Sequence, residues 1–170
     1  MASALSHGVA ALSIGTCFYR PQTPKRVWIA AVLCSVEPDI DVIGFRSGIH
    51  YGDFWGHRGF THSLVFASLL ASIVTFSIFR RLSSGIGRFV LFAYLFLATA
   101  SHGVLDAMTN GGLGVAFFSP FDTTRYFLPW RPIRVSPTSV HGFLSARGCA
   151  VSKASFGEFG FRRFSLGDWW

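Results

Sequence analysis

Four long apolar segments constrain the fold of this chain more than any other feature. They run over residues 2–19, 27–45, 62–79 and 89–108. Each is 18 to 20 residues long, and a helix that crosses a bilayer needs about 20. The third and fourth segments lack the polar stripe that surface helices of soluble proteins carry, which disfavours a soluble helical core. We therefore expect an all-α integral membrane bundle of about four helices, followed by an irregular C-terminal tail.

The composition agrees with a membrane class. Only 14% of the residues are charged and the mean hydropathy is +0.44, whereas a soluble domain carries about 25% charged residues. The net charge of +7 raises the alternative of nucleic-acid binding. The basic residues lie in short loops and in the tail, so we expect membrane lipids and no nucleic acid as partners. Three cysteines without CxxC spacing argue against a disulfide framework or a thiolate zinc site.

The ionisable residues are segregated along the chain. In an up-down bundle, residues 20–26 and 80–88 connect helices at one end, and they carry only basic charges. Up to Asp106 the chain has five acids and five histidines, and all ten fall at the other end. A carboxylate at membrane depth costs about 2.5 kcal/mol or more, and a bound divalent cation would remove that cost. We therefore predict a metal site with these candidate ligands: His7, Asp39, Asp41, His57, His62, His102 and Asp106.

The local motifs supply the ligands in pairs. Asp39 and Asp41 follow Pro38, which weakens the helix. The pair could bring two carboxylates to a metal ion, and a polar loop after a membrane helix explains it equally well. His102 and Asp106 are four apart and so share one helix face. They could be two ligands, a ligand with its orienting partner, or a buried structural pair.

The segment from His57 to Ser63 is the strongest local signal. We expect Gly59 to permit the turn that brings His57 and His62 together. Thr61 is the expected N-cap of the third helix. Arg58 could bind an anionic substrate or pair with a nearby acid. The candidate catalytic residues are Asp41, His62 and Arg58.

Imidazole and carboxylate ligands suit Zn²⁺, Mn²⁺ or Fe²⁺, and such an ion can activate water for hydrolysis. The leading hypothesis is a metal-dependent hydrolase, acting on a phosphoester or a lipid-derived small molecule. A metal or proton transporter is an alternative, although the third segment offers only Ser and Thr at mid-membrane. A non-catalytic membrane regulator with a structural metal is the third.

The same residues resemble a known family. They are His7, the Glu37-Pro38-Asp39-Ile40-Asp41 stretch, residues 57–63, residues 101–106 with Thr109 and Gly112, and the Ser119-Pro120-Phe121 stretch. This pattern is similar to the YdjM/YbcI-type membrane-bound metal-dependent hydrolases of bacteria. The resemblance covers residues 1–140 and implies a multi-pass protein of the bacterial inner (plasma) membrane with hydrolase activity. Some members are described as LexA-regulated.

Residues 141–170 depart from that resemblance. Family members continue with a further apolar segment, whereas this stretch ends in Gly167-Asp168-Trp169-Trp170 without one. We expect two regions, a helical metal-dependent hydrolase-like domain over 1–140 and an atypical, truncated or frame-shifted tail over 141–170. Basic residues in the short loops favour a site outside the cytoplasm, and those in the tail favour the opposite orientation.

Overall fold

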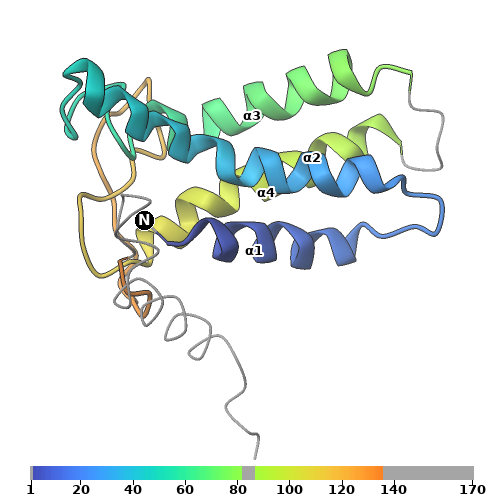
Figure 1. The fold of residues 1–170 in the computed structure, drawn as a ribbon, viewed down its shortest axis with the longest axis horizontal. Helices are drawn as coiled ribbons and strands as arrows, with labels where there is room; N and C mark the ends of the chain where they lie inside the picture. Colours follow the sequence, from blue (N-terminus) through green and yellow to red (C-terminus); the bar gives the residue numbers. More distant parts are fainter. Residues whose placement is uncertain (1, 82–86, 136–170) are drawn as a thin grey trace, which may run out of the picture.

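The computed structural model describes residues 2–81 and 87–135, and within them the fold is all-helical. Four α-helices lie side by side in an up-down arrangement: α1 (Ala4–Cys17), α2 (Lys25–Val36), α3 (Leu64–Ile73) and α4 (Arg88–Ala107) (Figure 1). The connection 18–24 lies at one end, together with residues 79–81 and the start of α4 (Figure 1). The long connection between α2 and α3 and the segment after α4 gather at the other end, beside the N-terminus (Figure 1). The expected all-α fold is confirmed for the described residues.

The helix ends follow local chemistry. The Ser3 side chain caps α1 by accepting a hydrogen bond from the Ser6 amide. The α-helix of α2 ends at Val36, and the chain continues as a 3₁₀ helix, η1 (Glu37–Ser47), which carries Pro38 in its first turn. The expected weakening of this helix at Pro38 is therefore confirmed. The η1 helix ends at Gly48, whose φ of 81° suits glycine.

The start of α3 differs from the expectation. A short 3₁₀ helix, η2 (Phe60–His62), precedes it, and Ser63 is the N-cap, accepting a hydrogen bond from the Phe66 amide. The prediction of Thr61 as the cap was wrong, because its hydroxyl donates to Asp41 instead. The α3 helix continues as one stretch of π-helix, η3 (Val74–Ile78).

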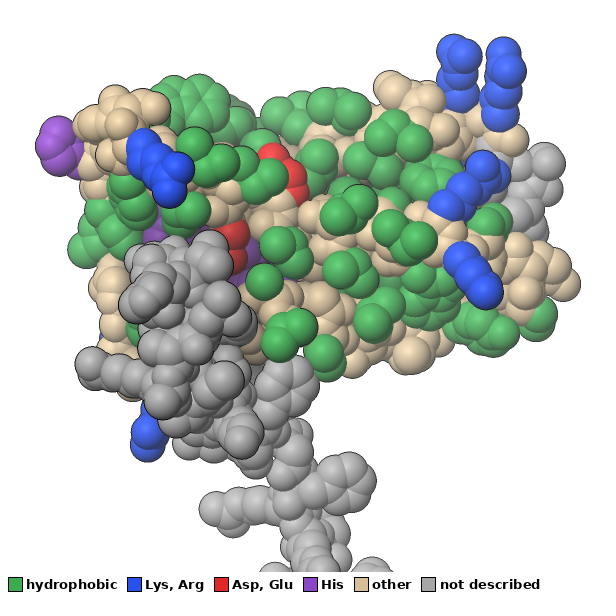
Figure 2. Space-filling view, in the orientation of Figure 1, with side chains coloured by type: hydrophobic (Ala, Val, Ile, Leu, Met, Phe, Trp, Pro, Cys, Tyr) green, Lys and Arg blue, Asp and Glu red, His purple; other side chains and the backbone are tan. Residues whose placement is uncertain are grey.

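The outer surface of the bundle is apolar. Exposed large side chains include Ile29, Leu33, Leu69, Ile73 and Phe89. Figure 2 shows hydrophobic side chains over much of the helix face in view. Among the described helices, α4 alone is long and apolar enough to cross a membrane; α1 and Leu64–Ile78 are apolar but shorter. Four spanning helices are therefore not supported, because Pro38 and the caps make three of the helices shorter than their apolar segments.

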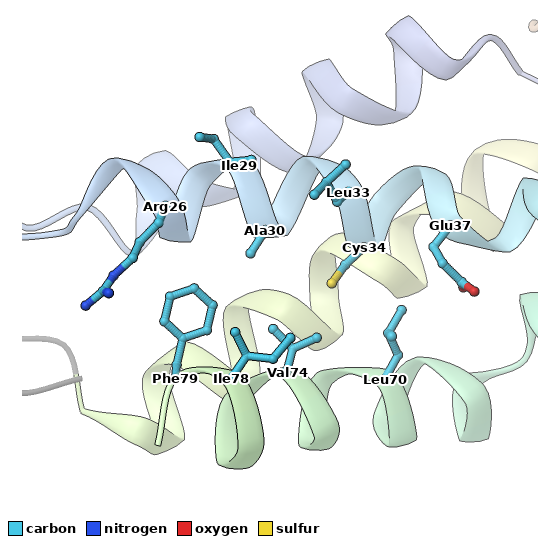
Figure 3. A pocket seen from close by; sticks show the side chains of 10 residues that line it. All are labelled: Arg26, Ile29, Ala30, Leu33, Cys34, Glu37, Leu70, Val74, Ile78 and Phe79. Atoms are coloured by element: carbon cyan, nitrogen blue, oxygen red, sulfur yellow. The ribbon is translucent and has the colours of Figure 1, made fainter. Parts of the chain in front are cut away.

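A groove runs along the outside between α2 and α3. Its volume is about 430 Å³, and Figure 3 shows side chains from both helices lining it. Arg26 stands at one end and Glu37 at the other. Between them the lining is apolar: Ile29, Ala30, Leu33, Cys34, Leu70, Val74, Ile78 and Phe79.

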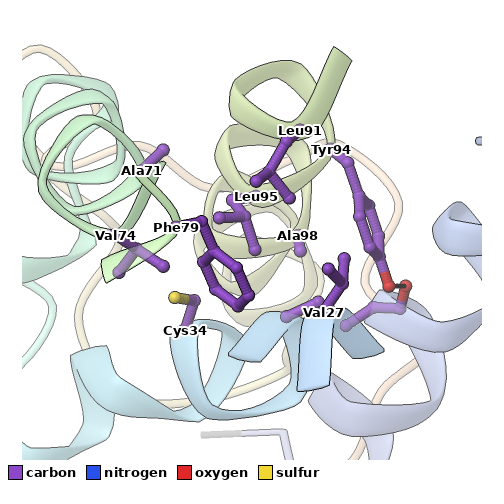
Figure 4. Close-up of a cluster of buried hydrophobic side chains, with 11 residues drawn as sticks. Val27, Cys34, Ala71, Val74, Phe79, Leu91, Tyr94, Leu95 and Ala98 are labelled. Carbon is purple, nitrogen blue, oxygen red and sulfur yellow. Dashed lines mark hydrogen bonds between the residues drawn. The ribbon is translucent and has the colours of Figure 1, made fainter. Parts of the chain in front are cut away.

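The hydrophobic core lies away from the acids and histidines, where small residues allow the helices to pack closely (Figure 4). Tyr94 of α4 has the largest side chain in this cluster, and its hydroxyl donates to the Ala11 carbonyl of α1. A Cβ atom at Gly15 would lie 2.4 Å from that hydroxyl. Glycine is therefore required there for α1 and α4 to approach each other. The cluster comprises Ala11, Val27, Ala31, Cys34, Ala71, Val74, Phe79, Leu91, Tyr94, Leu95 and Ala98.

Candidate metal centre

The loop between η1 and α3 brings two histidines to the end of the bundle. A Cβ atom at Gly59 would lie 2.4 Å from the Phe54 carbonyl oxygen, so the tight turn there needs glycine, as the sequence indicated. Arg58, directly before it, has a φ of 65°, which is uncommon for a residue with a side chain. On the other side, Gly103 lets α4 approach this segment, since a Cβ there would lie 3.0 Å from the His62 carbonyl oxygen.

Four ligand-type side chains converge on one point. Asp39 of η1, His62 of η2, and His102 and Asp106 of α4 offer atoms that all lie within 4.8 Å of one another. The Nε2 atoms of His62 and His102 are 3.0 Å apart. Asp39 Oδ1 lies 3.3 Å from His102 Nε2, and Asp106 Oδ2 lies 3.6 Å from His62 Nε2. Two imidazoles and two carboxylates form a donor set that fits Zn²⁺, Mn²⁺ or Fe²⁺.

The outer nitrogens of both rings face hydrogen-bond acceptors. His102 Nδ1 lies 2.7 Å from the Ser35 carbonyl oxygen, so Nδ1 must carry the proton. His62 Nδ1 lies 3.3 Å from Asp41 Oδ2 and 3.1 Å from Thr61 Oγ1, whose own proton goes to Asp41. The two Nε2 atoms then face each other at 3.0 Å, and either a proton on one of them or a bound cation satisfies the pair. This is the outer-shell pattern that orients histidine ligands of metals.

The Asp41 carboxylate contacts the side chains of His57, Thr61 and His62. Its Oδ1 lies 2.7 Å from His57 Nδ1, and its Oδ2 accepts from Thr61 at 2.7 Å. Burial raises the pKa of Asp41, but the hydrogen bonds from His57 and His62 outweigh it and hold the pKa below its usual value. Asp41, His57 and His62 also satisfy the distance requirement for a second metal group. Both oxygens of Asp41 are already hydrogen-bonded, which suits an orienting role better than a ligand role.

The protonation of the histidines follows their surroundings. Burial lowers the pKa of His62, but hydrogen bonds to Asp106 and Asp41 overcome this and raise the pKa to about 9. Without a metal, a proton thus supplies the positive charge that the cluster demands. Burial lowers the pKa of His57 despite its bond to Asp41. His57 is therefore neutral near pH 7, and its buried Nε2 has no hydrogen-bond partner.

Arg58 is fully buried and bonded to the protein. Its Nε donates to Asp106 Oδ2 at 3.0 Å, and its Nη2 donates to Thr109 Oγ1 at 2.9 Å. Its Nη1 donates to the carbonyl oxygens of Gly111 and Leu113. Of the two roles expected for this residue, the structure shows pairing with an acid.

His7 and Asp39 retain buried atoms without partners. The His7 ring stacks on His102 with centroids 3.7 Å apart, and its Nε2 lies 3.9 Å from Asp106 Oδ1. Within residues 2–81 and 87–135, neither ring nitrogen of His7 has a hydrogen-bond partner, and the same holds for both oxygens of Asp39. His7 therefore lies beside the group of four rather than within it. The structure brings together all seven residues that the sequence nominated.

Sequence reasoning missed several supporting residues. Arg125 donates to the backbone carbonyls of His57, Tyr51 and Asp53 and so holds the histidine loop. The Ser35 carbonyl orients His102. Neither contact has a local sequence signal, because a backbone acceptor can be supplied by any residue type. The tail over 141–170 lies outside the described residues, and its truncation stays a prediction.

Comparison with known proteins decides the family. The family profile described as YdjM inner membrane protein matches residues 1–164. The chain belongs to the YdjM inner membrane protein family. It is 36% identical over 151 residues to the inner membrane protein YbcI of Escherichia coli strain K12, covering 89% of this chain and 86% of that protein. No solved structure matches the chain.

Membership of the YdjM family establishes the class of membrane protein and confirms the resemblance seen in the sequence. The possible metal groups rest on this chain's own geometry.

Proposed function

We propose that this YdjM-family chain is a membrane-bound, metal-dependent hydrolase. The observation that carries the proposal is the pair of Nε2 atoms of His62 and His102, 3.0 Å apart and flanked by Asp39 and Asp106. Both outer ring nitrogens face acceptors, so the inner Nε2 atoms can turn toward a bound cation. A divalent ion there would lower the pKa of a bound water and polarise a phosphoryl or carbonyl oxygen.

Each neighbouring residue has a separate task in this proposal. Asp41 orients His57 and His62 through hydrogen bonds. Arg58 positions Asp106 and does not touch the substrate, because its donors are occupied by the protein. His57 is the proton acceptor: Asp41 fixes its Nδ1 proton, which leaves Nε2 unprotonated.

We propose a phosphoester or a lipid-derived molecule as substrate, with the bundle set in the inner membrane and the site near one face. The apolar helix surface and the family support this placement. The transporter alternative gains no support, since the core that follows the site is apolar, with Ala11, Val27 and Leu95 fully buried. The hydrolysis screen described below distinguishes a hydrolase from a non-catalytic protein with a structural metal.

Metal content of the purified full chain tests the site. Wild-type protein should carry close to a stoichiometric amount of a transition metal after purification, measured by mass spectrometry of the elements. His62→Ala and His102→Ala should lose it. His50→Ala is the matched control, because its side chain is 88% exposed and lies outside the cluster. Equal metal in all four proteins refutes the site.

Hydrolysis is tested next on the metal-loaded protein. A screen of phosphomonoesters, phosphodiesters and phospholipids should give a product that His57→Gln abolishes without loss of metal. Metal retained by the wild type with no turnover of any substrate class would leave only the structural role and refute the hydrolase.

A further inference from the structure

The apolar groove between α2 and α3 ends beside the proposed metal centre. Glu37, the last lining residue, begins η1, and Asp39 follows two residues later. Ser35, in the same turn of chain, supplies the carbonyl that orients His102. The same short stretch of backbone therefore lines the groove and supports the site.

The dimensions of the groove match one lipid chain. From Arg26 to Glu37 the helix rises by about 16 Å, at about 1.5 Å per residue. One leaflet of a bilayer has a hydrocarbon depth of about 15 Å, half of the whole core. The volume of about 430 Å³ falls within the roughly 300–1,000 Å³ of small-molecule pockets.

The two ends of the groove differ chemically. At the far end the Arg26 guanidinium stacks over the Phe79 ring, 5.7 Å from its centroid, and closes the groove. At the site end Glu37 has a buried carboxylate oxygen, Oε2, with no hydrogen-bond partner among the residues that the structure describes. That oxygen can accept a hydrogen bond from a hydroxyl or ammonium group. An amphiphile with its polar end toward the metal centre satisfies both ends.

We propose that this groove holds one acyl chain of a membrane lipid whose polar head group lies at the metal centre. The proposal deepens the proposed function and rests on it for the fate of the head group. A protein partner fits less well, since interfaces use about 20–30 residues a side and only ten line the groove. The family's location in the inner membrane supplies lipid at the groove's open side.

Photolabelling of the full chain in lipid nanodiscs tests the groove. The discs contain phosphatidylethanolamine, phosphatidylglycerol and a phospholipid with a diazirine on one acyl chain. Labelled residues are mapped by peptide mass spectrometry. We expect labels on Leu33, Leu70 and Val74 in excess over Phe89, which is 79% exposed and lies outside the groove.

Ala30→Trp fills the groove and should reduce groove labelling at least about tenfold, the change expected when two buried methylenes lose their contacts. Leu69→Trp is the matched control, since it places an indole on an exposed position of α3 outside the groove. Leu33→Gln is a second variant, at a rim position that is 65% exposed, and it should lower groove labelling without loss of core packing. Labelling of Phe89 should stay unchanged in all three.

The outcomes separate this inference from the proposed function, because metal content is measured on the same samples. Uniform labelling of all exposed helix faces, insensitive to Ala30→Trp and to Leu33→Gln, overturns the acyl-chain site. Labelling of Phe89 with none at Leu33, Leu70 or Val74 also overturns it, because the groove is then covered by something other than lipid. Groove labelling with a metal-free wild type keeps the acyl-chain site and removes the hydrolase.

Discussion

Arg58 offers the sharpest test of how the site is held together. Arg58→Ala leaves the buried Asp106 carboxylate without its guanidinium partner and removes the donors to the Gly111 and Leu113 carbonyl oxygens. Removing one partner of a buried ion pair costs about 3–5 kcal/mol. Domains are stable by only about 5–15 kcal/mol. The variant should therefore lose a large part of its stability.

The expected shift is measurable by thermal unfolding. For a chain of 170 residues, 1 kcal/mol corresponds to about 2–4 °C, so Arg58→Ala should lower Tm by roughly 6–20 °C. Circular dichroism in one detergent, with a chelator present, keeps metal occupancy out of the comparison. Arg46→Ala is the control, because Arg46 is exposed. If Arg58→Ala and Arg46→Ala had the same Tm, the role assigned to the buried guanidinium would be wrong.

A comparison of glycine with alanine at position 58 separates the effect of backbone strain from the effect of the lost side-chain contacts. Its φ of 65° costs a residue with a Cβ atom about 1–2 kcal/mol, and glycine avoids that cost. Arg58→Gly should therefore melt about 2–8 °C above Arg58→Ala. A lower Tm for the glycine variant would show that the backbone is unstrained there.

Three further predictions concern the surroundings of the site. Ser63→Ala removes the cap of α3 and should lower the free energy of unfolding by about 1 kcal/mol, measured by denaturant titration; no loss would mean that Ser63 does not cap α3. Gly103→Ala places a Cβ 3.0 Å from the His62 carbonyl oxygen, so bound metal should fall, and wild-type content would show that α4 can shift. In metal-free protein, the free energy of unfolding should fall as pH rises from about 6.5 to about 9, because folded His62, with its pKa raised to about 9, holds a proton that the unfolded chain releases. A free energy of unfolding that stays constant over that pH range would refute the raised pKa of His62.

The gathering of ligands could be predicted because it depends on topology alone. Once four apolar segments alternate in direction, His7, Asp39, His62 and His102 must fall at one end, whatever the side-chain packing. The residue spacing of four between His102 and Asp106 likewise places them on one face of α4, as the structure shows.

The roles of individual residues could not be predicted in the same way. Arg58 and Arg125 look like anion-binding residues in a sequence, yet their partners are mainly backbone carbonyls brought near by long-range folding. Helix lengths were overestimated because hydropathy does not register where an α-helix becomes a 3₁₀ helix, as it does after Val36. The shift of the cap from Thr61 to Ser63 depended on Asp41, which lies 20 residues away from Thr61.

The four-residue cluster draws its members from three separate segments, η1, η2 and α4. An unfolded chain cannot assemble it, so an ion that binds there acts on the folding equilibrium by mass action. At a free concentration 100 times its Kd, the ion would stabilise the fold by about 2.7 kcal/mol. The fraction of unfolded chain offered to proteases would then drop about a hundredfold. The lifetime of this protein in the cell would follow the supply of that ion, whether or not any substrate is being consumed.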